Sequence, residues 1–462
     1  MPRRDIIWIT LESVRQDHTS LSGHERDTTP NVRRLAARSD SAAFSNCFAH
    51  GIWTRTSSAS MLTGSAPASH GVLSFDSKLP ADIETVPEQL SERGYRTAAV
   101  SPIAQVSEAT GLDRGFDDFH YLTRGTLLEE AGLRSMVRYL RQIRHHSAGL
   151  TMDTKKHSIG YLVAEIATRH IRQRADEDDP LFLYVHIGDS HHPYYPPKGW
   201  REAFVDDLQL DLAAALSVAM EMSDRLIEQM AAGLPFSDAE WNAIEVLYDT
   251  AIRYVDSLAG TIVDTARSYL DDPIVVVTAD HGELLGEEGC LAHMLVANTA
   301  VTNVPLVISG IEGLDGGNCL VQPADVLKTI SNRCELSLSV PAGQDVSAGE
   351  RAVAVTQRGG KRARKKIDQI RDHDPESGSH FCPGNLTSVR TADYRYQRCN
   401  GQEDLFVLPD ETVDRAESEP AITERFRRVT DEWLAEHARE ESTDRAEFSA
   451  QMRRQLEDLG YF

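Results

Sequence analysis

The run from Ile274 to Ala279 constrains the fold of this chain more than any other stretch of its sequence. It reads Ile-Val-Val-Val-Thr-Ala, with Asp-Asp-Pro before it and Asp-His-Gly after it. A short apolar run between turn-forming residues predicts a strand that is buried on both faces of a sheet. Comparable runs occur at residues 6–10, 96–101, 181–187 and 304–309. Because helical patterns separate these runs, we expect an α/β fold with a doubly wound, mostly parallel sheet flanked by helices.

Changes in composition near residues 341 and 423 divide the chain into three predicted parts. Residues 1–340 contain the alternating strands and helices and form the main predicted domain. A polar, glycine-containing linker opens residues 341–422, where a hairpin pattern predicts a small α+β subdomain with an antiparallel sheet. Residues 423–462 are charged and predict a helical segment on the outside. The basic run at residues 358–366 is expected to be a solvated loop, with binding of a polyanionic substrate as the alternative.

The charge of the chain limits its partners. The formal net charge is -23, which disfavours nucleic acids and anionic membranes as partners of the molecule as a whole. Most of the basic residues are arginine, and an acidic, lysine-poor composition is similar to that of proteins from salt-loving microbes. An ordinary acidic enzyme explains the same composition, so both interpretations stay open.

The cysteines and the apolar runs indicate the compartment. The six cysteines are far apart and contain no Cys-x-x-Cys pair, so we predict neither a zinc knuckle nor a disulfide framework. The apolar run at residues 6–10 is too short for a signal peptide, and no later run approaches the length of a transmembrane helix. We therefore expect a cytoplasmic protein without a membrane segment.

Polar side chains follow several of the predicted strands. Glu12 follows the first strand, and Asp280 and His281 follow the strand at Ile274–Ala279. In an open α/β sheet, ligands collect at the carboxyl ends of the strands. Thr54 precedes a helical pattern, and the N-terminus of a helix favours an anion. Carboxylate, imidazole and hydroxyl groups at one edge predict a site for a divalent metal.

Several motifs carry a resemblance to the sulfatase family of the alkaline phosphatase superfamily. The segment Asp280-His281-Gly282-Glu283 resembles the family's DHGE signature, and Thr29-Pro30-Asn31 with Leu35 resembles its TPNLDRLA segment. Ser60-Met61-Leu62-Thr63-Gly64 resembles the end of the nucleophile motif CxPSRASLLTG. Further matches are Val304-Pro305-Leu306 to the VPLI strand and residues 389–394 to the RTDDYK strand. The resemblance implies an alkaline phosphatase-like catalytic domain over residues 1–340.

The chain departs from the family pattern at the reaction centre. By motif alignment, the catalytic cysteine or serine of sulfatases falls at Thr54, and threonine cannot become the formylglycine that those sulfatases use. The arginine of the motif falls at Ser58, and the paired aspartates of the calcium site fall at Glu12 and Ser13. Glu, Thr, Asp and His at these places resemble the one-metal site of lipoteichoic acid synthases and phosphoethanolamine transferases.

The resemblance implies a set of roles. Glu12, Thr54, Asp280 and His281 are predicted to hold one divalent ion, which is manganese, zinc, magnesium or calcium. Thr54 is the predicted nucleophile, with His191 and His293 stabilising charge or transferring protons. Arg55 and His192 are predicted to bind substrate.

Alternatives remain at the site and for the function. A second metal held by Asp189, His186 and His192 is the alternative to one metal. The predicted function is hydrolysis of phosphate diesters or sulfate esters on small molecules or glycans. The alternatives are transfer of a phospho group to an alcohol and a degenerate binding protein.

Overall fold

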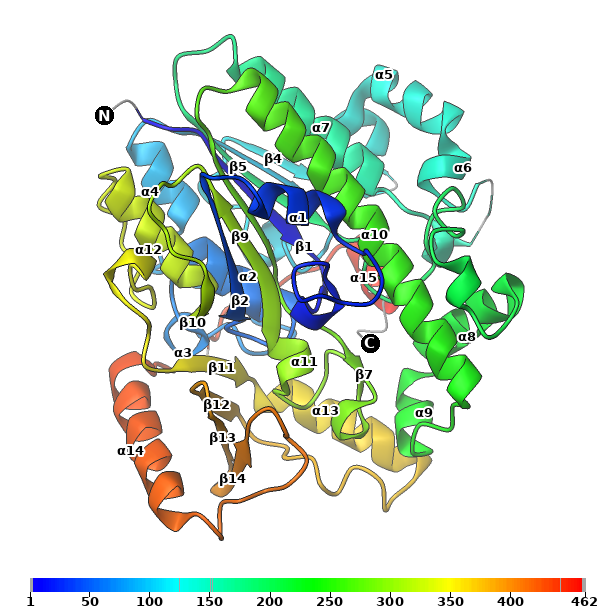
Figure 1. Ribbon diagram of the computed structural model, residues 1–462, viewed down its shortest axis with the longest axis vertical. Helices are drawn as coiled ribbons and strands as arrows, with labels where there is room; N and C mark the ends of the chain where they lie inside the picture. Colours follow the sequence, from blue (N-terminus) through cyan, green and yellow to red (C-terminus); the bar gives the residue numbers. More distant parts are fainter. Residues whose placement is uncertain (1–2, 124, 150, 152, 441, 459–462) are drawn as a thin grey trace.

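A mixed sheet of eight strands forms the centre of the protein in the computed structural model, which describes residues 3–458 except 124, 150, 152 and 441 (Figure 1). The strand order is β10-β2-β9-β6-β1-β5-β3-β4. The strands are β1 (Ile6–Leu11), β2 (Ser41–Phe48), β3 (Arg96–Ser101), β4 (Asp118–Tyr121), β5 (Leu181–Ile187), β6 (Ile274–Ala279), β9 (Asn303–Ser309) and β10 (Gly317–Val321). The sheet confirms the predicted α/β class.

The centre of the sheet is parallel and buried on both faces. Strand β1 pairs in parallel with β5 on one side and with β6 on the other. All residues of these three strands are buried, which explains why each is a continuous apolar run rather than an alternating one. Strand β9 pairs antiparallel with both β2 and β6. An apolar run indicates burial but not direction, so the sequence did not distinguish β9 from its parallel neighbours.

Helices flank the sheet in two groups. Their bounds are α1 (Pro30–Ala36), α2 (Thr54–Thr63), α3 (Pro67–His70), α4 (Val86–Glu92), α5 (Leu127–Arg141), α6 (Ile143–His146), α7 (Gly160–Arg174), α8 (Leu212–Asp224), α9 (Leu226–Ala231), α10 (Asp238–Tyr269), α11 (Thr299–Thr302) and α12 (Pro323–Arg333). Helices α1 and α7 pack with the long helix α10, whereas α4 and α12 pack with α2. Among the described helices, none has both the length and the apolar character needed to cross a membrane.

Helix α2 matters most for the site, because its first residue is Thr54. The sequence predicted a helix after Thr54, whereas the observed helix already includes Thr54 and ends before Gly64. Gly64 has a φ of 65°, a left-handed conformation that glycine adopts without strain. A Cβ at this position would lie 2.6 Å from Val340 Cγ1, so the turn also needs the missing side chain.

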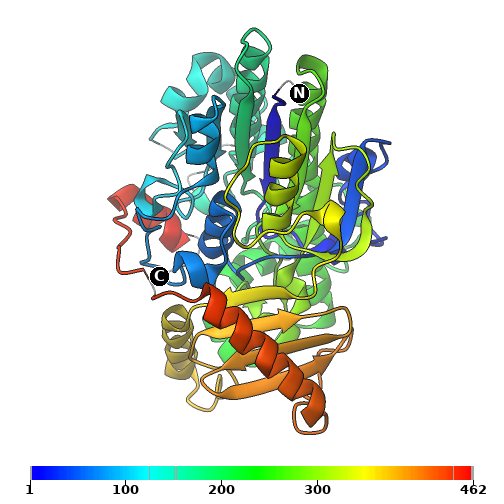
Figure 2. The same ribbon diagram turned by 90° about the vertical axis from the view of Figure 1, so that its left-hand side faces the viewer.

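A second, four-stranded antiparallel sheet lies beside the main sheet (Figure 2). It contains β11 (Ala354–Arg358), β12 (Leu386–Arg390), β13 (Tyr394–Cys399) and β14 (Gln402–Val407), and β7 (Leu284–Leu285) with β8 (Leu291–Ala292) forms a separate small ribbon. Phe426 of α14 (Pro420–His437) packs on this sheet against Val355, Val389, Tyr396 and Leu405. The small sheet of the predicted subdomain is therefore present, while the boundaries at residues 340 and 422 stay a prediction.

Two expectations about this region are wrong. Residues 358–366 do not form a solvated loop, because Arg358 ends β11, Gly359 caps the next helix, and the other residues begin α13 (Gly360–His373). Arg358 and Lys366 are 2% and 5% exposed. The cysteines also form a disulfide, between Cys382 and Cys399, whose Cα atoms are 6.2 Å apart. Sequence spacing missed this pair because the two cysteines are brought together by the fold of the small sheet.

The end of the chain returns to the main domain. The backbone N–H of Lys78 donates to the Asp444 carbonyl oxygen, and helix α15 (Ala450–Asp458) follows. Gln455 of this helix contacts the Tyr121 hydroxyl and the Pro102 carbonyl oxygen, each at 2.5 Å. The predicted helical segment thus comprises two helices that pack in different places, and its residues 459–462 lie outside the described residues.

Candidate active site

Three adjacent strands bring Glu12, His186 and Asp280 to one edge of the sheet. In the register of the central strands, Thr10 lies opposite His186 on β5 and opposite Thr278 on β6. Glu12 follows β1, and Asp280 follows β6, so all three groups lie at the carboxyl ends of parallel strands. Their ligand atoms lie within 4.8 Å of one another, and all three residues are buried.

Thr54 joins this cluster from the N-terminus of α2. Its Oγ1 donates to Glu12 Oε1 at 2.6 Å and lies 3.3 Å from His281 Nε2. Trp53 precedes the helix in an extended conformation, so the unsatisfied backbone N–H groups of the first turn lie beside Thr54. A hydroxyl, two carboxylates and two imidazoles therefore converge where a helix end favours an anion.

The hydrogen bonds of Asp280 and His281 leave one atom of each side chain that could ligate a metal directed at the cluster. Asp280 Oδ1 accepts from the backbone N–H groups of Ser13 and His281 at 3.0 and 2.9 Å. Its Oδ2 is buried and has no hydrogen-bond partner among the described residues, but lies 3.3 Å from His281 Nε2. His281 Nδ1 contacts the Gly282 carbonyl oxygen at 2.7 Å, which assigns the proton to Nδ1 and leaves Nε2 as an acceptor. This donor set fits a divalent cation.

The electrostatics of the cluster also suit a cation. Burial and the charge of the neighbouring Glu12 raise the pKa of Asp280 above its ordinary range. Burial opposes ionisation of Glu12 as well, but the charge of His186 and its 2.5 Å hydrogen bond lower the pKa of Glu12. Two ionised carboxylates in one buried site repel each other, which raises the free energy of the folded protein. A divalent cation between them would offset this repulsion.

A second group of side chains consists of His191, His192 and His293. Their ligand atoms also lie within 4.8 Å of one another. Each ring is held through Nδ1: His191 by the His192 carbonyl oxygen at 2.6 Å, His192 by Ser223 Oγ at 2.9 Å and His293 by Glu283 Oε1 at 3.2 Å. The His293 ring lies 4.5 Å from that of His281, so this histidine group adjoins the first cluster. Burial lowers the pKa of all three imidazoles.

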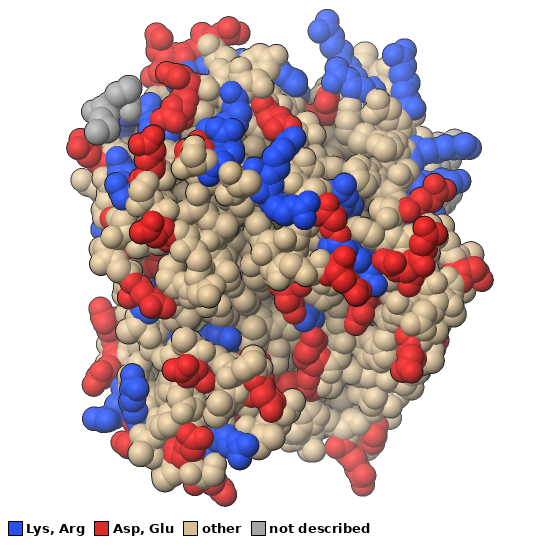
Figure 3. Space-filling view, viewed as in Figure 1, with Lys and Arg blue, Asp and Glu red and all other residues tan. Residues whose placement is uncertain are grey.

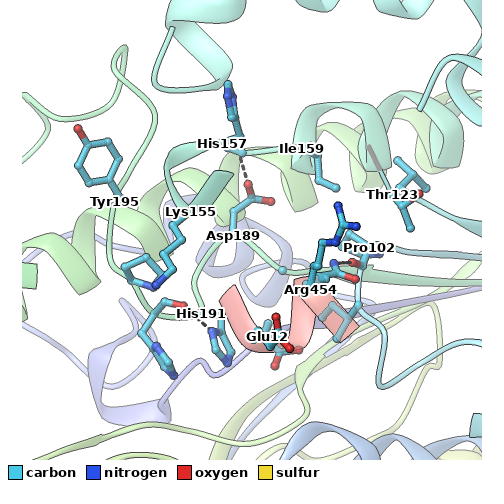
Figure 4. A pocket seen from close by; sticks show the side chains of 18 of the residues that line it. Glu12, Pro102, Thr123, Lys155, His157, Ile159, Asp189, His191, Tyr195 and Arg454 are labelled. Carbon is cyan, nitrogen blue, oxygen red and sulfur yellow. Dashed lines mark hydrogen bonds between the residues drawn. The ribbon is translucent and has the colours of Figure 1, made fainter. Parts of the chain in front are cut away.

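A cavity of about 730 Å³ opens beside the two groups. Figure 4 shows Glu12 and His191 at one end of it, with Asp189 and Lys155 further along the wall. Apolar side chains form much of the remaining wall, including Ile103, Ile159, Leu122, Pro193 and Tyr195. The cavity has room for a substrate whose charged group lies at the cluster and whose leaving group is largely apolar.

Comparison with known proteins identifies the family. The sequence model of the sulfatase family, described as "Sulfatase", matches residues 4–330. The chain belongs to the sulfatase family. It is 23% identical to a sulfatase of Formosa agariphila over 72% of this chain and 69% of that protein. A phosphonate monoester hydrolase of Agrobacterium radiobacter shares the fold, with a TM-score of 0.70 and 20% identity over 94% of this chain and 96% of that one.

The fold extends to a further structure with a bound sugar. A protein solved in complex with its substrate, D-glucosamine-2-N,6-O-disulfate, gives a TM-score of 0.65 and 16% identity over 94% of this chain and 98% of that one. These matches confirm the family assignment and the alkaline phosphatase-like fold. The present sulfatase-family protein is a hydrolase of sulfuric or phosphoric esters.

The alternative second metal site is not assembled in this sulfatase-family protein. His186 lies with Glu12 and Asp280, while His192 lies in the histidine group. Asp189 instead hydrogen bonds through Oδ1 to the Ser158 hydroxyl. His186 lies in the run at residues 181–187 that the sequence predicted as a strand, but only the sheet order shows that this strand is the neighbour of β1.

Arg55 does not point at the cluster. Its Nε donates to Gln105 Oε1 at 2.7 Å, and its Nη1 donates to the carbonyl oxygens of Ser77, at 2.9 Å, and Phe75. The side chain is fully buried, and the guanidinium lies over the Trp53 ring at 5.5 Å. This geometry favours a structural role for Arg55 in orienting the start of α2, whereas His192 lies at the cavity as a substrate-binding residue would.

Helix α13 supplies basic residues that the sequence analysis did not place at the site. The Arg362 guanidinium lies 4.5 Å from the centre of the Trp53 ring, and its Nη1 lies 3.4 Å from the His293 carbonyl oxygen. Lys366 is one helical turn further on and is 5% exposed, and burial together with the charges of Arg362 and Lys365 lowers its pKa to about 7. The four-residue spacing within the basic run was the available signal, because it places both side chains on one face of a helix.

Proposed function

We propose that this protein hydrolyses phosphate diesters in a metal-dependent reaction that passes through a covalent ester on Thr54. The observation that carries the proposal is the position of Thr54 Oγ1, 2.6 Å from Glu12 and 3.3 Å from His281. Glu12, Asp280, His281 and Thr54 would hold the ion, and His186 would either join them or fix Glu12. When bound, a divalent ion would polarise the Thr54 hydroxyl, as zinc lowers the pKa of bound water from 15.7 to about 7.

Thr54 would act as the nucleophile, and a nearby histidine would transfer the protons. Thr54 Oγ1 forms a bond to phosphorus while the bond from phosphorus to the leaving oxygen breaks. The Nδ1 contacts of His191 and His293 leave Nε2 of each ring as a proton acceptor. One of these imidazoles would take the Thr54 proton, which is directed at Glu12 in the structure, and give it to the leaving oxygen, which balances the first half-reaction. In the second half-reaction the same imidazole accepts a proton from water, the water oxygen forms a bond to phosphorus, and the bond from phosphorus to Thr54 Oγ1 breaks. The imidazole then gives the proton to Oγ1, which restores the Thr54 hydroxyl.

Arg362 and Lys366 of α13 would stabilise the negative charge of the transferred group. The transferred group keeps negative charge throughout, so fixed positive charge at its oxygens stabilises the transition state. The arginine that sulfatases carry in the nucleophile motif is replaced here by Ser58. Arg362, stacked on Trp53 and next to His293, is positioned to supply that charge, and Lys366 lies one turn further along α13.

Sulfate ester hydrolysis is the second candidate, because the family model that matches the chain is that of the sulfatases. Thr54 argues for the phosphate substrate, since threonine cannot provide the aldehyde that formylglycine sulfatases use. The apolar wall of the cavity suits an aryl leaving group for either ester, so the same set of chromogenic esters tests both.

The experiment is a comparison of three esters with purified protein of known metal content. Bis-p-nitrophenyl phosphate, p-nitrophenyl phosphate and p-nitrophenyl sulfate would be assayed with Mn²⁺, Zn²⁺, Mg²⁺ or Ca²⁺ and after chelation. We expect the diester to be turned over fastest, and only with metal. Faster hydrolysis of the sulfate would select the second candidate. Added glycerol would reveal transfer by formation of a glycerol phosphate ester. Metal binding without turnover of any ester would support a binding protein instead.

A further inference from the structure

The segment from residue 131, which contains most of α5 and all of α6, differs in charge from the rest of the molecule and from the first turn of α5, which carries Glu129 and Glu130. Residues 131–152 contain no Asp or Glu, whereas the chain as a whole has a net charge of -23. The same residues include Arg134, Arg138, Arg141 and Arg144. Figure 3 shows blue side chains gathered at the upper right, where Figure 1, in the same view, shows α5 and α6. We call this surface the arginine face.

Large apolar side chains lie exposed beside these arginines. Leu133, Val137 and Leu140 of α5 are 70%, 39% and 54% exposed. Spacings of three and four residues place them on one side of the helix, and Tyr139 fixes the opposite side because it is buried. Leu128, before the kink at Gly132, is 57% exposed. Exposed apolar residues gathered on one helix mark an interaction surface, whereas scattered ones need no explanation.

The combination of arginine with exposed leucine and valine indicates which kind of partner this face binds. An amphipathic helix with arginine beside exposed leucine and valine is the kind that lies in the interface of a bilayer, where apolar side chains enter the acyl region and arginines meet lipid phosphates. An anionic surface repels the acidic parts of the molecule and attracts this carboxylate-free face, where arginines lie beside exposed apolar side chains. We propose that the arginine face docks this protein on an anionic lipid bilayer.

The arginine face is joined directly to the cavity of the site. Leu122 and Thr123 line the cavity just before α5 begins, and Lys155 and His157 line it just after the segment ends. Docking would therefore bring the cavity close to lipid headgroups. The docking proposal itself does not depend on the proposed chemistry, because binding to a bilayer can be measured without turnover.

Sedimentation with vesicles tests the proposal on the full chain. The protein would be mixed at low salt with vesicles of phosphatidylcholine alone, or with about a third of phosphatidylglycerol. We expect binding only to the anionic vesicles and its loss at high salt. The triple variant R134Q/R141Q/R144Q should reduce the partition coefficient by roughly a hundredfold, since each arginine near the surface contributes about fivefold. Arg138 is left in place because it pairs with Glu165 at 2.8 Å.

Two further variants make the test specific. L133S/V137S/L140S removes exposed apolar side chains and should weaken binding while hydrolysis of a soluble ester stays unchanged. R33Q/R34Q/R38Q removes three arginines that are about half exposed elsewhere on the surface, and it should bind like the wild type. The proposal is overturned if the wild type fails to sediment, if both arginine variants lose binding equally, or if neutral vesicles bind as well. A dimer that L133S/V137S/L140S dissociates, without vesicle binding, would assign the face to a second copy of the chain.

Discussion

Thr54 Oγ1 and Glu12 Oε1 lie 2.6 Å apart, and this contact joins the first residue of α2 to the end of the central strand β1. The contact places a hydroxyl at the positive end of a helix and against a buried carboxylate at the same time. Neither element alone provides that environment, and the predictions below follow from it and from the residues that surround it.

Replacement of Thr54 should show whether its hydroxyl acts as the nucleophile. Thr54→Ala should lower kcat at least about a thousandfold, because removal of a nucleophile abolishes the covalent route. Thr54→Ser keeps the hydroxyl and should retain activity within roughly tenfold. Steady-state kinetics and intact-mass analysis of the trapped adduct would measure both effects. Thr63→Ala, at the other end of α2, serves as the control, and equal losses in Thr63→Ala and Thr54→Ala would contradict the assignment.

Asp280→Asn should have opposite effects on stability with and without metal. In metal-free protein the substitution should leave the free energy of unfolding equal or higher, because the buried carboxylate beside Glu12 raises the energy of the folded state. With ion at about a hundred times its Kd, the wild type should gain roughly 2.7 kcal/mol, and the variant much less. Thermal unfolding with and without chelator would measure both. Asp264→Asn, exposed on α10, should respond to metal like the wild type.

The α13 cations should govern binding of the charged group. Arg362→Gln and Lys366→Gln should each lower kcat/KM roughly ten- to a hundredfold, the range expected when one charged hydrogen bond to the transition state is lost. Inhibition by inorganic phosphate should weaken in parallel. Lys361→Gln provides a matched control on the same helix, since Lys361 is 53% exposed and pairs with Asp76. Unchanged phosphate inhibition in both site variants would exclude the proposed role.

Asp249 should make stability depend on acid pH. The carboxylate is fully buried and contacts His18 and His24 at 2.7 Å and Arg26 at 2.9 Å. Burial opposes its ionisation, but His18 and His24 lower its pKa to about 2. A lowered carboxyl pKa gives stability that is present above about pH 4 and lost as the pH falls towards 2, here about 2 kcal/mol.

Urea unfolding at several pH values would test this dependence. Asp249→Asn should lose about 3 kcal/mol or more at pH 7, because it leaves the buried cationic group uncompensated. The difference between wild type and variant should shrink as the pH falls from about 4 to 2. Asp271→Asn, at an exposed position, should keep the wild-type profile. A constant difference at every pH would refute the assigned titration.

The sequence by itself determined the strands of the centre and the groups that follow them. Buried runs such as Ile274–Ala279 are recognisable because burial on both faces removes polar residues from a strand. The turn after such a strand is where Asp280 and His281 must lie, and Thr54 could be assigned from the helix and motif that follow it.

Only the tertiary structure decided which of these groups meet. The order of strands placed His186 beside Glu12. The antiparallel direction of β9 and the pairing of Cys382 with Cys399 could not be predicted from the sequence either. The basic run became a helix whose buried face brings Arg362 to Trp53. Local periodicity reports how deeply a segment is buried, but neighbours across a sheet or between subdomains are chosen by packing over long sequence separations, and no single segment carries that information.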